Sequence, residues 1–276
     1  MVTDLDIYLF DLRGYLVIEN ALGADHLREA NCVLDELRQL KPGEWSGHVH
    51  GHVFSSEKEG LNLQQIYEAG EPFEHFIDHP AWIEHVKTFV GGQNTFDCHH
   101  GPLFIDENFA SIRGPGEAIF IHSGPVPWLK RCQFHVRDQQ FNCGQINVLI
   151  ALSDIGPGDG ATIVVPGSHK SNFRHPEVER IKSSSRTGTV DSVSASVEVH
   201  LRAGDALLFV DAICHGSVER MNAGERRNVV YRYGPSWGFF RHGYRPSKAL
   251  LERLTVERRR IVWPHERIAG APGDEE

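Results

Sequence analysis

The sequence lacks the features that would assign the protein to a membrane, to an export route or to nucleic acid. No apolar run approaches the roughly 18 residues that a membrane-spanning helix requires. The first residues, MVTDLDIYLFDLRGYL, carry acidic side chains early and lack the apolar segment and cleavage site of a secretory signal. The net charge of −9 offers no basic surface for nucleic acid. We therefore expect a cytoplasmic protein with neither a membrane nor a nucleic acid as partner.

Paired cysteines are also absent. The five cysteines are scattered and form no Cys-x-x-Cys motif: Cys32, Cys98, Cys132, Cys143 and Cys214. This pattern is typical of reduced thiols in a cytoplasmic protein. Nothing in the sequence indicates an oligomeric state.

What is present fits one large domain. The chain has 276 residues, 40% of them hydrophobic and 24% charged, which is ample for a buried core. We predict a single domain over residues 1–276 with a helical N-terminal part over about 1–94. A strand is expected at 15–18 and a long polar loop at 41–70. A C-terminal helix is expected over about 246–262.

The sequence pattern changes at about residue 95. From there to about 240, short strand-like runs such as GQINVLIALSD, ATIVVPGSH and SVEVHLRAGDALLFV alternate with glycine- and proline-containing turns. Many short strands separated by such turns favour a β-sandwich or jelly roll. The predicted fold class is therefore mainly β with flanking helices, with a jelly-roll core over about 95–240.

The segment LRAGDALLFVDAICHGSVERMNAGERRNVVYRYGP holds the first candidate site residues. His215 ends an apolar strand, where a neutral imidazole can face the mouth of a barrel and bind a metal. Arg226 follows eleven residues later and can lie on the adjacent strand, where its guanidinium can clamp a carboxylate through two parallel hydrogen bonds. Either residue alone also fits plain packing or a solvated surface, but the pair in this setting is more specific.

These residues also carry a family resemblance. IALSDIGPGDGATIVVPGSHK, followed by GDALLFVDAICHGS and by the arginine eleven residues past the histidine, resembles the phytanoyl-CoA dioxygenase family. The likeness extends over nearly the whole chain, from RGYLVIENAL onward. It implies a double-stranded β-helix, which is a cupin-like jelly roll, with Fe(II) and 2-oxoglutarate in its mouth. It further implies that His215 is the distal iron ligand, that Arg226 binds the far carboxylate of 2-oxoglutarate, and that Ser217 supports this co-substrate.

Two alternatives exist for the other iron ligands, which in the family form a His-x-Asp motif within a triad of two histidines and one carboxylate. In DENFASIRGPGEAIFIHSG, His122 falls on the family's ligand position, and the 93 residues between it and His215 also suit the family. The other candidates are His135 and Asp138, in HVRD. Residues i and i+3 of a strand face opposite sides, so these two could reach one metal only through a bulge or turn. We favour His122 and keep His135 and Asp138 as the alternative.

With His122 as ligand, Gly124 stands where the family's carboxylate should be, giving a His-x-Gly site. One interpretation is a halogenase, in which a small residue leaves a coordination position for chloride. Another is an oxygenase whose carboxylate comes from elsewhere, with Asp138 as the first candidate. The third is a lost iron site in a non-catalytic jelly-roll binding module.

The resemblance implies, as the main expectation, a non-haem Fe(II)- and 2-oxoglutarate-dependent dioxygenase. Such an enzyme oxidises a C–H bond of a small organic substrate with O2 and releases succinate and CO2. The halogenase and the binding module remain alternatives, and the sequence does not identify the substrate.

Overall fold

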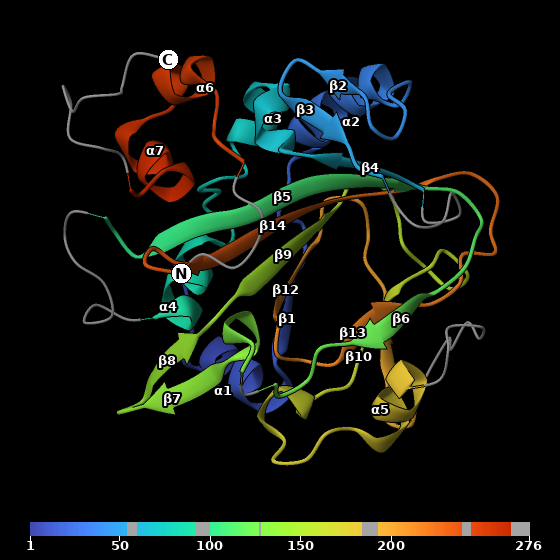
Figure 1. Cartoon of the computed structure of the whole chain (residues 1–276), viewed down its shortest axis with the longest axis vertical. Helices are drawn as coiled ribbons and strands as arrows, with labels where there is room; N and C mark the ends of the chain where they lie inside the picture. Colours follow the sequence, from blue (N-terminus) through green and yellow to red (C-terminus); the bar gives the residue numbers. More distant parts are fainter. Residues whose placement is uncertain (54–59, 92–99, 127, 184–192, 239–243, 266–276) are drawn as a thin grey trace.

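Two antiparallel β-sheets form the core of the computed structural model, which describes residues 1–53, 60–91, 100–126, 128–183, 193–238 and 244–265 (Figure 1). Within these residues the large sheet has eight strands: β1 (Tyr15–Ile18), β12 (Ala206–Val210), β9 (Ile146–Ala151), β14 (Arg226–Pro235), β5 (Leu103–Arg113), β4 (Leu61–Gln64), β3 (Val49–Gly51) and β2 (Trp45–Ser46), in that order. The small sheet has the order β11 (Val197–Val199), β10 (Thr162–Val164), β13 (His215–Ser217) and β6 (Ile119–His122). A separate hairpin joins β7 (Phe134–Arg137) and β8 (Gln140–Cys143).

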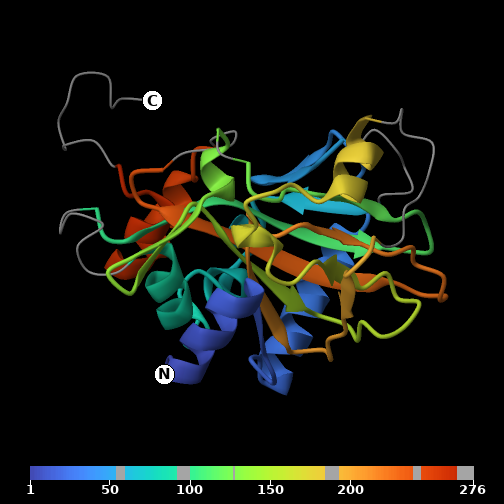
Figure 2. The same cartoon turned by 90° about the horizontal axis from the view of Figure 1, so that it is seen from below.

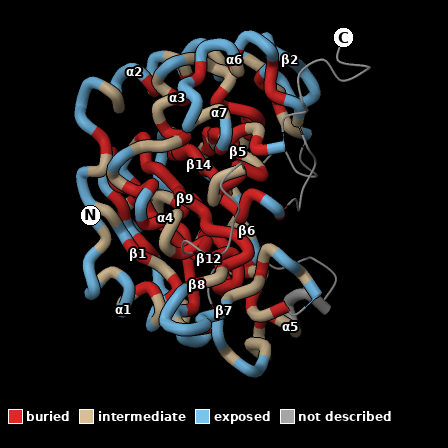
Figure 3. The backbone as a smooth tube through the Cα atoms, turned by 90° about the vertical axis from the view of Figure 1, so that its left-hand side faces the viewer, coloured by how far each residue is buried: buried red, intermediate tan, exposed pale blue. Residues whose placement is uncertain are grey.

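The centre of the large sheet follows from its sequence. Every residue of β9, INVLIA, and of β12, ALLFV, is buried. Short apolar runs rich in Val, Ile and Leu form strands when both faces of the sheet are covered. Figure 3 shows the buried residues concentrated along β9, β12, β14 and β5, with the exposed residues on the surrounding helices and loops.

The two faces of β14 have different partners. On the outer face, the hydroxyl groups of Tyr231 and Tyr233 donate to the carbonyl oxygens of Phe73 (2.6 Å) and Phe76 (2.8 Å). Side chains alternate along a strand, so Arg226, five residues before the outward-facing Tyr231, begins the opposite, inner face. That inner face is directed at the small sheet, because Arg113 of β5, the cross-strand partner of Arg226, donates a hydrogen bond to Ser217 of β13.

The helices cover the outside of this core. They are α1 (Asp4–Arg13), α2 (Ala24–Leu37), α3 (Glu71–Glu74), α4 (Ile83–Val90), α5 (Pro176–Ser183), α6 (Lys248–Arg253) and α7 (Val256–Val262). Arg227 donates to Asp35 of α2 at 2.7 Å, so α2 packs on the outer face of the large sheet. Figure 2 shows α1 and α2, in dark blue, on the opposite side of the large sheet from α5, in yellow. Within the residues described, no helix combines the length and the apolar character needed to cross a membrane.

The structure departs from the sequence-based expectations at both ends of the chain. The expected strand at 15–18 is β1, but the N-terminal part also supplies β2, β3 and β4, all three of which lie in the expected loop at 41–70. Those short strands are held by pairing with one another and with β5, which no local pattern reveals. The expected C-terminal helix is two helices, because the Thr255 hydroxyl accepts from the amide of Arg258 and starts α7.

Candidate active site

His122 and His215 lie side by side on neighbouring strands of the small sheet. The two residues are direct partners in the antiparallel pair β6–β13. Their ring centroids are 4.3 Å apart and the ring planes are inclined by 57°. The ring of Phe209, from the large sheet, lies 4.9 Å from that of His215. The structure therefore brings together the two histidines that the family resemblance selects.

Hydrogen bonds fix the orientation of both rings. Nδ1 of His122 donates to the carbonyl of Phe120 at 3.0 Å, and Nδ1 of His215 donates to the carbonyl of Ile213 at 2.8 Å. A carbonyl can only accept, so the proton is on Nδ1 in each ring and the lone pair is on Nε2. Metal-binding histidines are commonly held in this way, with the second ring nitrogen bonded to a backbone carbonyl.

Both rings are neutral at physiological pH. Burial lowers the pKa of His122 from its ordinary value. Burial, followed by the charge of His122, lowers the pKa of His215 to about 3, and the carboxylate of Asp211 opposes this only in part. Neutral imidazole is the form that binds a metal. The donor set of this pair thus fits a transition metal such as ferrous iron.

The backbone after His122 turns in a way that favours glycine. Ser123 and Gly124 have φ angles of +65° and +93°. A β-carbon built on Gly124 would lie 3.0 Å from Sγ of Cys214. Among the residues that the structure describes, no group of three or more His, Cys, Asp or Glu is placed to hold a metal ion. Within those residues, no carboxylate, at the position of Gly124 or elsewhere, therefore completes a three-ligand metal site with the histidine pair.

The alternative candidates lie elsewhere. His135 and Asp138 are both exposed, His135 on β7 and Asp138 in the turn to β8. Asp138 and Gln139 have φ angles of +50° and +61°, as in a two-residue hairpin turn. The structure does not bring His135 or Asp138 to the histidine pair. The identity of the iron ligands stays a prediction.

Arg226 and Ser217 lie around a second feature, a cluster of buried arginines. Arg226 pairs across strands with Arg113 of β5. Nη1 of Arg113 donates to Oγ of Ser217 at 2.8 Å, which links the two sheets beside the histidine pair. Nη1 of Arg226 donates to the carbonyl of Gly160. Ser217 is two residues beyond His215 on the same strand, so the metal-site and arginine features adjoin.

Within the described residues, no carboxylate neutralises the buried charge of Arg226. Arg226 is 5% exposed, and its Nε lacks a hydrogen-bond partner among the residues described. No carboxylate in that same part of the chain forms an ion pair with it. Burial, followed by the charges of Arg113 and Arg220, lowers the pKa of Arg226 from 12.5 to about 9. The side chain stays cationic at neutral pH, and a site of this kind favours an anion.

Sequence reasoning missed two residues of this region, Arg113 and Asp211. Asp211 is 2% exposed and accepts hydrogen bonds from Nε of Arg131 (3.0 Å) and Nδ2 of Asn147 (3.3 Å). Its charge raises the pKa of both site histidines, against the larger effect of burial. Arg113 could have been found only from the strand register, whereas Asp211 carried a weak signal as a carboxylate four residues before His215.

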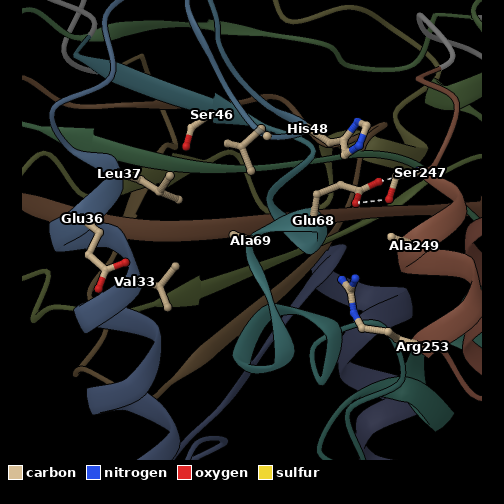
Figure 4. A pocket seen from close by; sticks show the side chains of 12 residues that line it. Val33, Glu36, Leu37, Ser46, His48, Glu68, Ala69, Ser247, Ala249 and Arg253 are labelled. Atoms are coloured by element: carbon tan, nitrogen blue, oxygen red, sulfur yellow. Dashed lines mark hydrogen bonds between the residues drawn. The ribbon is translucent and has the colours of Figure 1, made fainter.

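A cavity of about 280 Å³ lies apart from this site, between α2, β2, β3, η2 (Ile66–Ala69) and α6 (Figure 4). Glu68 accepts from the backbone N and from Oγ of Ser247, both at 2.7 Å. Arg253 pairs with Glu74 at 2.8 Å. These polar groups bond to one another and hold α6 in place, and none of the predicted site residues lines this cavity.

Two facing antiparallel sheets with a histidine pair between them define a cupin-like jelly roll, and solved structures share this fold. A structure of HygX from Streptomyces hygroscopicus with nickel and 2-oxoglutarate bound has a TM-score of 0.69 and 24% sequence identity, covering 87% of this chain and 90% of that one. The epimerase SnoN from nogalamycin biosynthesis has a TM-score of 0.55 at 16% identity, covering 83% and 81%. The predicted fold class is confirmed.

The chain belongs to the phytanoyl-CoA dioxygenase (PhyH) family, whose model matches residues 10–228. Among curated relatives, dioxygenase cdmD of Talaromyces verruculosus is 34% identical over 206 residues, which is 71% of this chain and 58% of that protein. Ectoine dioxygenase of Stutzerimonas stutzeri (strain A1501) is 24% identical over 241 residues, covering 81% and 74%. The match with cdmD thus spans little more than half of that relative's length.

Proposed function

We propose that the protein is an Fe(II)- and 2-oxoglutarate-dependent oxygenase that oxidises a small organic substrate with O2 and forms succinate and CO2. The observation that carries this proposal is the buried cation of Arg226, which has no carboxylate partner among the residues that the structure describes and adjoins a pair of neutral histidines. Family membership supports it. A dicarboxylate is the ligand that such an arrangement would need, because one end can pair with Arg226 while the other reaches the metal.

The residues of the chain have separate tasks in this proposal. Nε2 of His122 and Nε2 of His215 would hold the metal. Arg226 would bind the distal carboxylate of 2-oxoglutarate, and Ser217, oriented by Arg113, would bond to the same molecule. When bound, iron supplies the activation of O2 and of the substrate C–H bond. The protein contributes orientation and a site largely shielded from water.

A halogenase is the second candidate, and the observation that favours it is Gly124. The left-handed backbone and the nearby Cys214 thiol leave little room for a carboxylate there. Chloride could then take the position that a carboxylate takes in the family pattern. A non-catalytic binding module is the third candidate, but it gives no role to the uncompensated charge of Arg226.

The test is an anaerobic titration of the protein with Fe(II) and 2-oxoglutarate, followed by visible absorbance with and without chloride. We expect a charge-transfer band, which would report that iron and 2-oxoglutarate are bound together. A band that shifts with chloride would favour the halogenase. The absence of a band under all of these conditions would contradict both enzymatic candidates.

Arg226→Ala should weaken the binding of 2-oxoglutarate by roughly tenfold to a hundredfold, because the charge-assisted pair between the co-substrate carboxylate and a buried cation is lost. The matched control is Arg227→Ala, the next residue on the same strand. Its guanidinium lies on the outer face and pairs with Asp35 and Glu225. The control should lower stability slightly and keep the affinity for 2-oxoglutarate. Equal affinities of the wild type and Arg226→Ala would refute the role of Arg226.

A further inference from the structure

A strip of polar side chains crosses the inner face of the large sheet. It consists of Gln64 on β4, Glu107 on β5, Arg232 on β14 and Asn147 on β9, and we call it the polar strip. Nε2 of Gln64 donates to Glu107 Oε1 at 3.2 Å, and Arg232 pairs with Glu107 Oε2. Asn147 is the direct cross-strand partner of Arg232. The strip is therefore continuous across four adjacent strands.

The polar strip adjoins the histidine pair. Asn147 is the direct partner of Phe209 on β12, whose ring contacts His215 at 4.9 Å. Nδ2 of Asn147 donates to Asp211, and the charges of Asp211 and Arg232 both act on the two histidines. The strip thus begins where the reaction would take place and leads away from it toward the β4 side of the sheet.

Several atoms of the strip have no hydrogen-bond partner. They are Oδ1 of Asn147, Oε1 of Gln64 and Nε of Arg232, each buried and unpaired within the described ranges of the chain. Asn147 is 1% exposed and Gln64 is 5% exposed. Arg232 and Glu107, by contrast, keep 17% and 18% of their side chains exposed, so the middle of the strip can be reached from solvent.

Leaving such atoms unpaired is costly. A buried polar atom without a partner costs about 1–3 kcal/mol, and native proteins contain few of them. Two acceptors and one donor here lie along one face of the sheet, and the row begins beside the histidine pair. A ligand that satisfies all three needs groups that both donate and accept, and the hydroxyl group does both.

We propose that the polar strip binds the substrate and that this substrate is a small, hydroxyl-rich molecule, such as a polyol or a sugar derivative. The inference rests on the proposed oxygenase function and adds the substrate class to it. A molecule that offered only an apolar chain would leave the strip's atoms unpaired and would be rejected. Sites built to hydrogen-bond a substrate reject analogues that lack the matching group far more strongly than apolar pockets do.

The experiment uses the anaerobic protein loaded with Fe(II) and 2-oxoglutarate. Myo-inositol, maltose and octanoyl-CoA are titrated separately to 100 mM, or to the solubility limit for octanoyl-CoA, and calorimetry and the visible band report binding. At least one hydroxylated probe is expected to bind with a millimolar dissociation constant, and octanoyl-CoA is expected not to bind at this site. Asn147→Leu and Gln64→Leu should each weaken the hydroxylated probe roughly tenfold, as expected for one lost hydrogen bond.

Two further variants keep the test decisive. Glu107→Gln preserves size and tests the strip if a leucine variant fails to fold. Asn142→Leu is the matched control, since it makes the same replacement on the β7–β8 hairpin outside the strip, and it should leave probe binding unchanged. The inference is overturned if octanoyl-CoA binds and the hydroxylated probes do not, if neither hydroxylated probe binds, or if their affinity is unchanged in the strip variants. Failure of 2-oxoglutarate itself to bind would instead refute the proposed function.

Discussion

Gly124 shows how a single residue can set the character of the site. Its φ of +93° lies where L side chains are strained, and an added β-carbon would press on Cys214 Sγ at 3.0 Å. At the position where the family resemblance leads us to expect a carboxylate, the backbone therefore disfavours any side chain.

Gly124→Ala is expected to lower the free energy of unfolding by about 1–3 kcal/mol, from the left-handed φ and the close thiol. Denaturant unfolding measures this. Adding Cys214→Ala should recover the part of the loss that is due to the thiol contact. Gly114→Ala is the control, because its β-carbon would meet only the carbonyl of Gly224 at 4.0 Å. A Gly124→Ala variant as stable as the wild type would show that this loop relaxes freely.

Asn228 presents the opposite case, a side chain whose removal should help stability. It is 2% exposed, and its Oδ1 has no hydrogen-bond partner in the described part of the chain. It lies two residues beyond Arg226, on the same inner face. Asn228→Leu keeps the volume and removes the unpaired amide oxygen, so the free energy of unfolding should rise by about 1 kcal/mol.

Thermal or urea unfolding tests this prediction, with Asn147→Leu as the comparison. The amide of Asn147 donates to Asp211, so the same replacement there breaks a buried bond and should destabilise the protein. A loss of stability in Asn228→Leu as large as that in Asn147→Leu would contradict this interpretation of Asn228.

At the scale of elements, a histidine of α2 meets two histidines of the segment between α3 and α4. The ring of His26 on α2 lies 5.8 Å from those of His75 and His79, and the ring of His79 stacks on Trp82 at 4.4 Å. Burial, followed by the charge of His26, lowers the pKa of His79 from 6.5 to about 4. The charge of Asp78 opposes this shift, whereas those of His75 and Arg258 add to it.

This cluster predicts a pH dependence of stability. The folded state holds His79 neutral below the pH at which the unfolded chain protonates it, so the unfolded state binds more protons. The contribution of His79 is fully present above about pH 6.5 and is lost as the pH falls from 6.5 to about 4. Urea unfolding between pH 4 and 8 should show a shallower fall in His79→Gln than in the wild type. Parallel curves for the two proteins would show that His79 does not contribute.

For the whole molecule, ligand binding should appear as stability. A ligand that binds only the folded state stabilises it by about 2.7 kcal/mol at a hundredfold excess over its dissociation constant. Fe(II) and 2-oxoglutarate together should raise the melting temperature more than either does alone, because in the proposed function one 2-oxoglutarate molecule would contact both the metal and Arg226. In Arg226→Ala the effect of Fe(II) should remain while that of 2-oxoglutarate is largely lost. Differential scanning calorimetry under anaerobic conditions makes this comparison, and a rise with 2-oxoglutarate equal to that of the wild type would oppose the assignment.

Sequence reasoning reached those features that depend on local pattern. The strand at 15–18 and the buried strands β9 and β12 are visible as short apolar runs bounded by turns. His215 and Arg226 stand out because their motifs are contiguous in the chain. The sequence did not reveal those features that depend on pairing between distant segments. Strands β2 to β4 are an example, because they are too short to be recognised without β5 beside them.

The sequence by itself thus determined the fold class, the family and the motif that carries His215, Ser217 and Arg226, because these depend on local periodicity and contiguous residues. Only the tertiary structure decided that His122, and not His135, lies beside His215. It also decided that Arg113 reaches Ser217 and that four polar residues from four strands form one strip. The physical reason is strand register, since hydrogen bonding between strands far apart in the chain sets which side chains become neighbours.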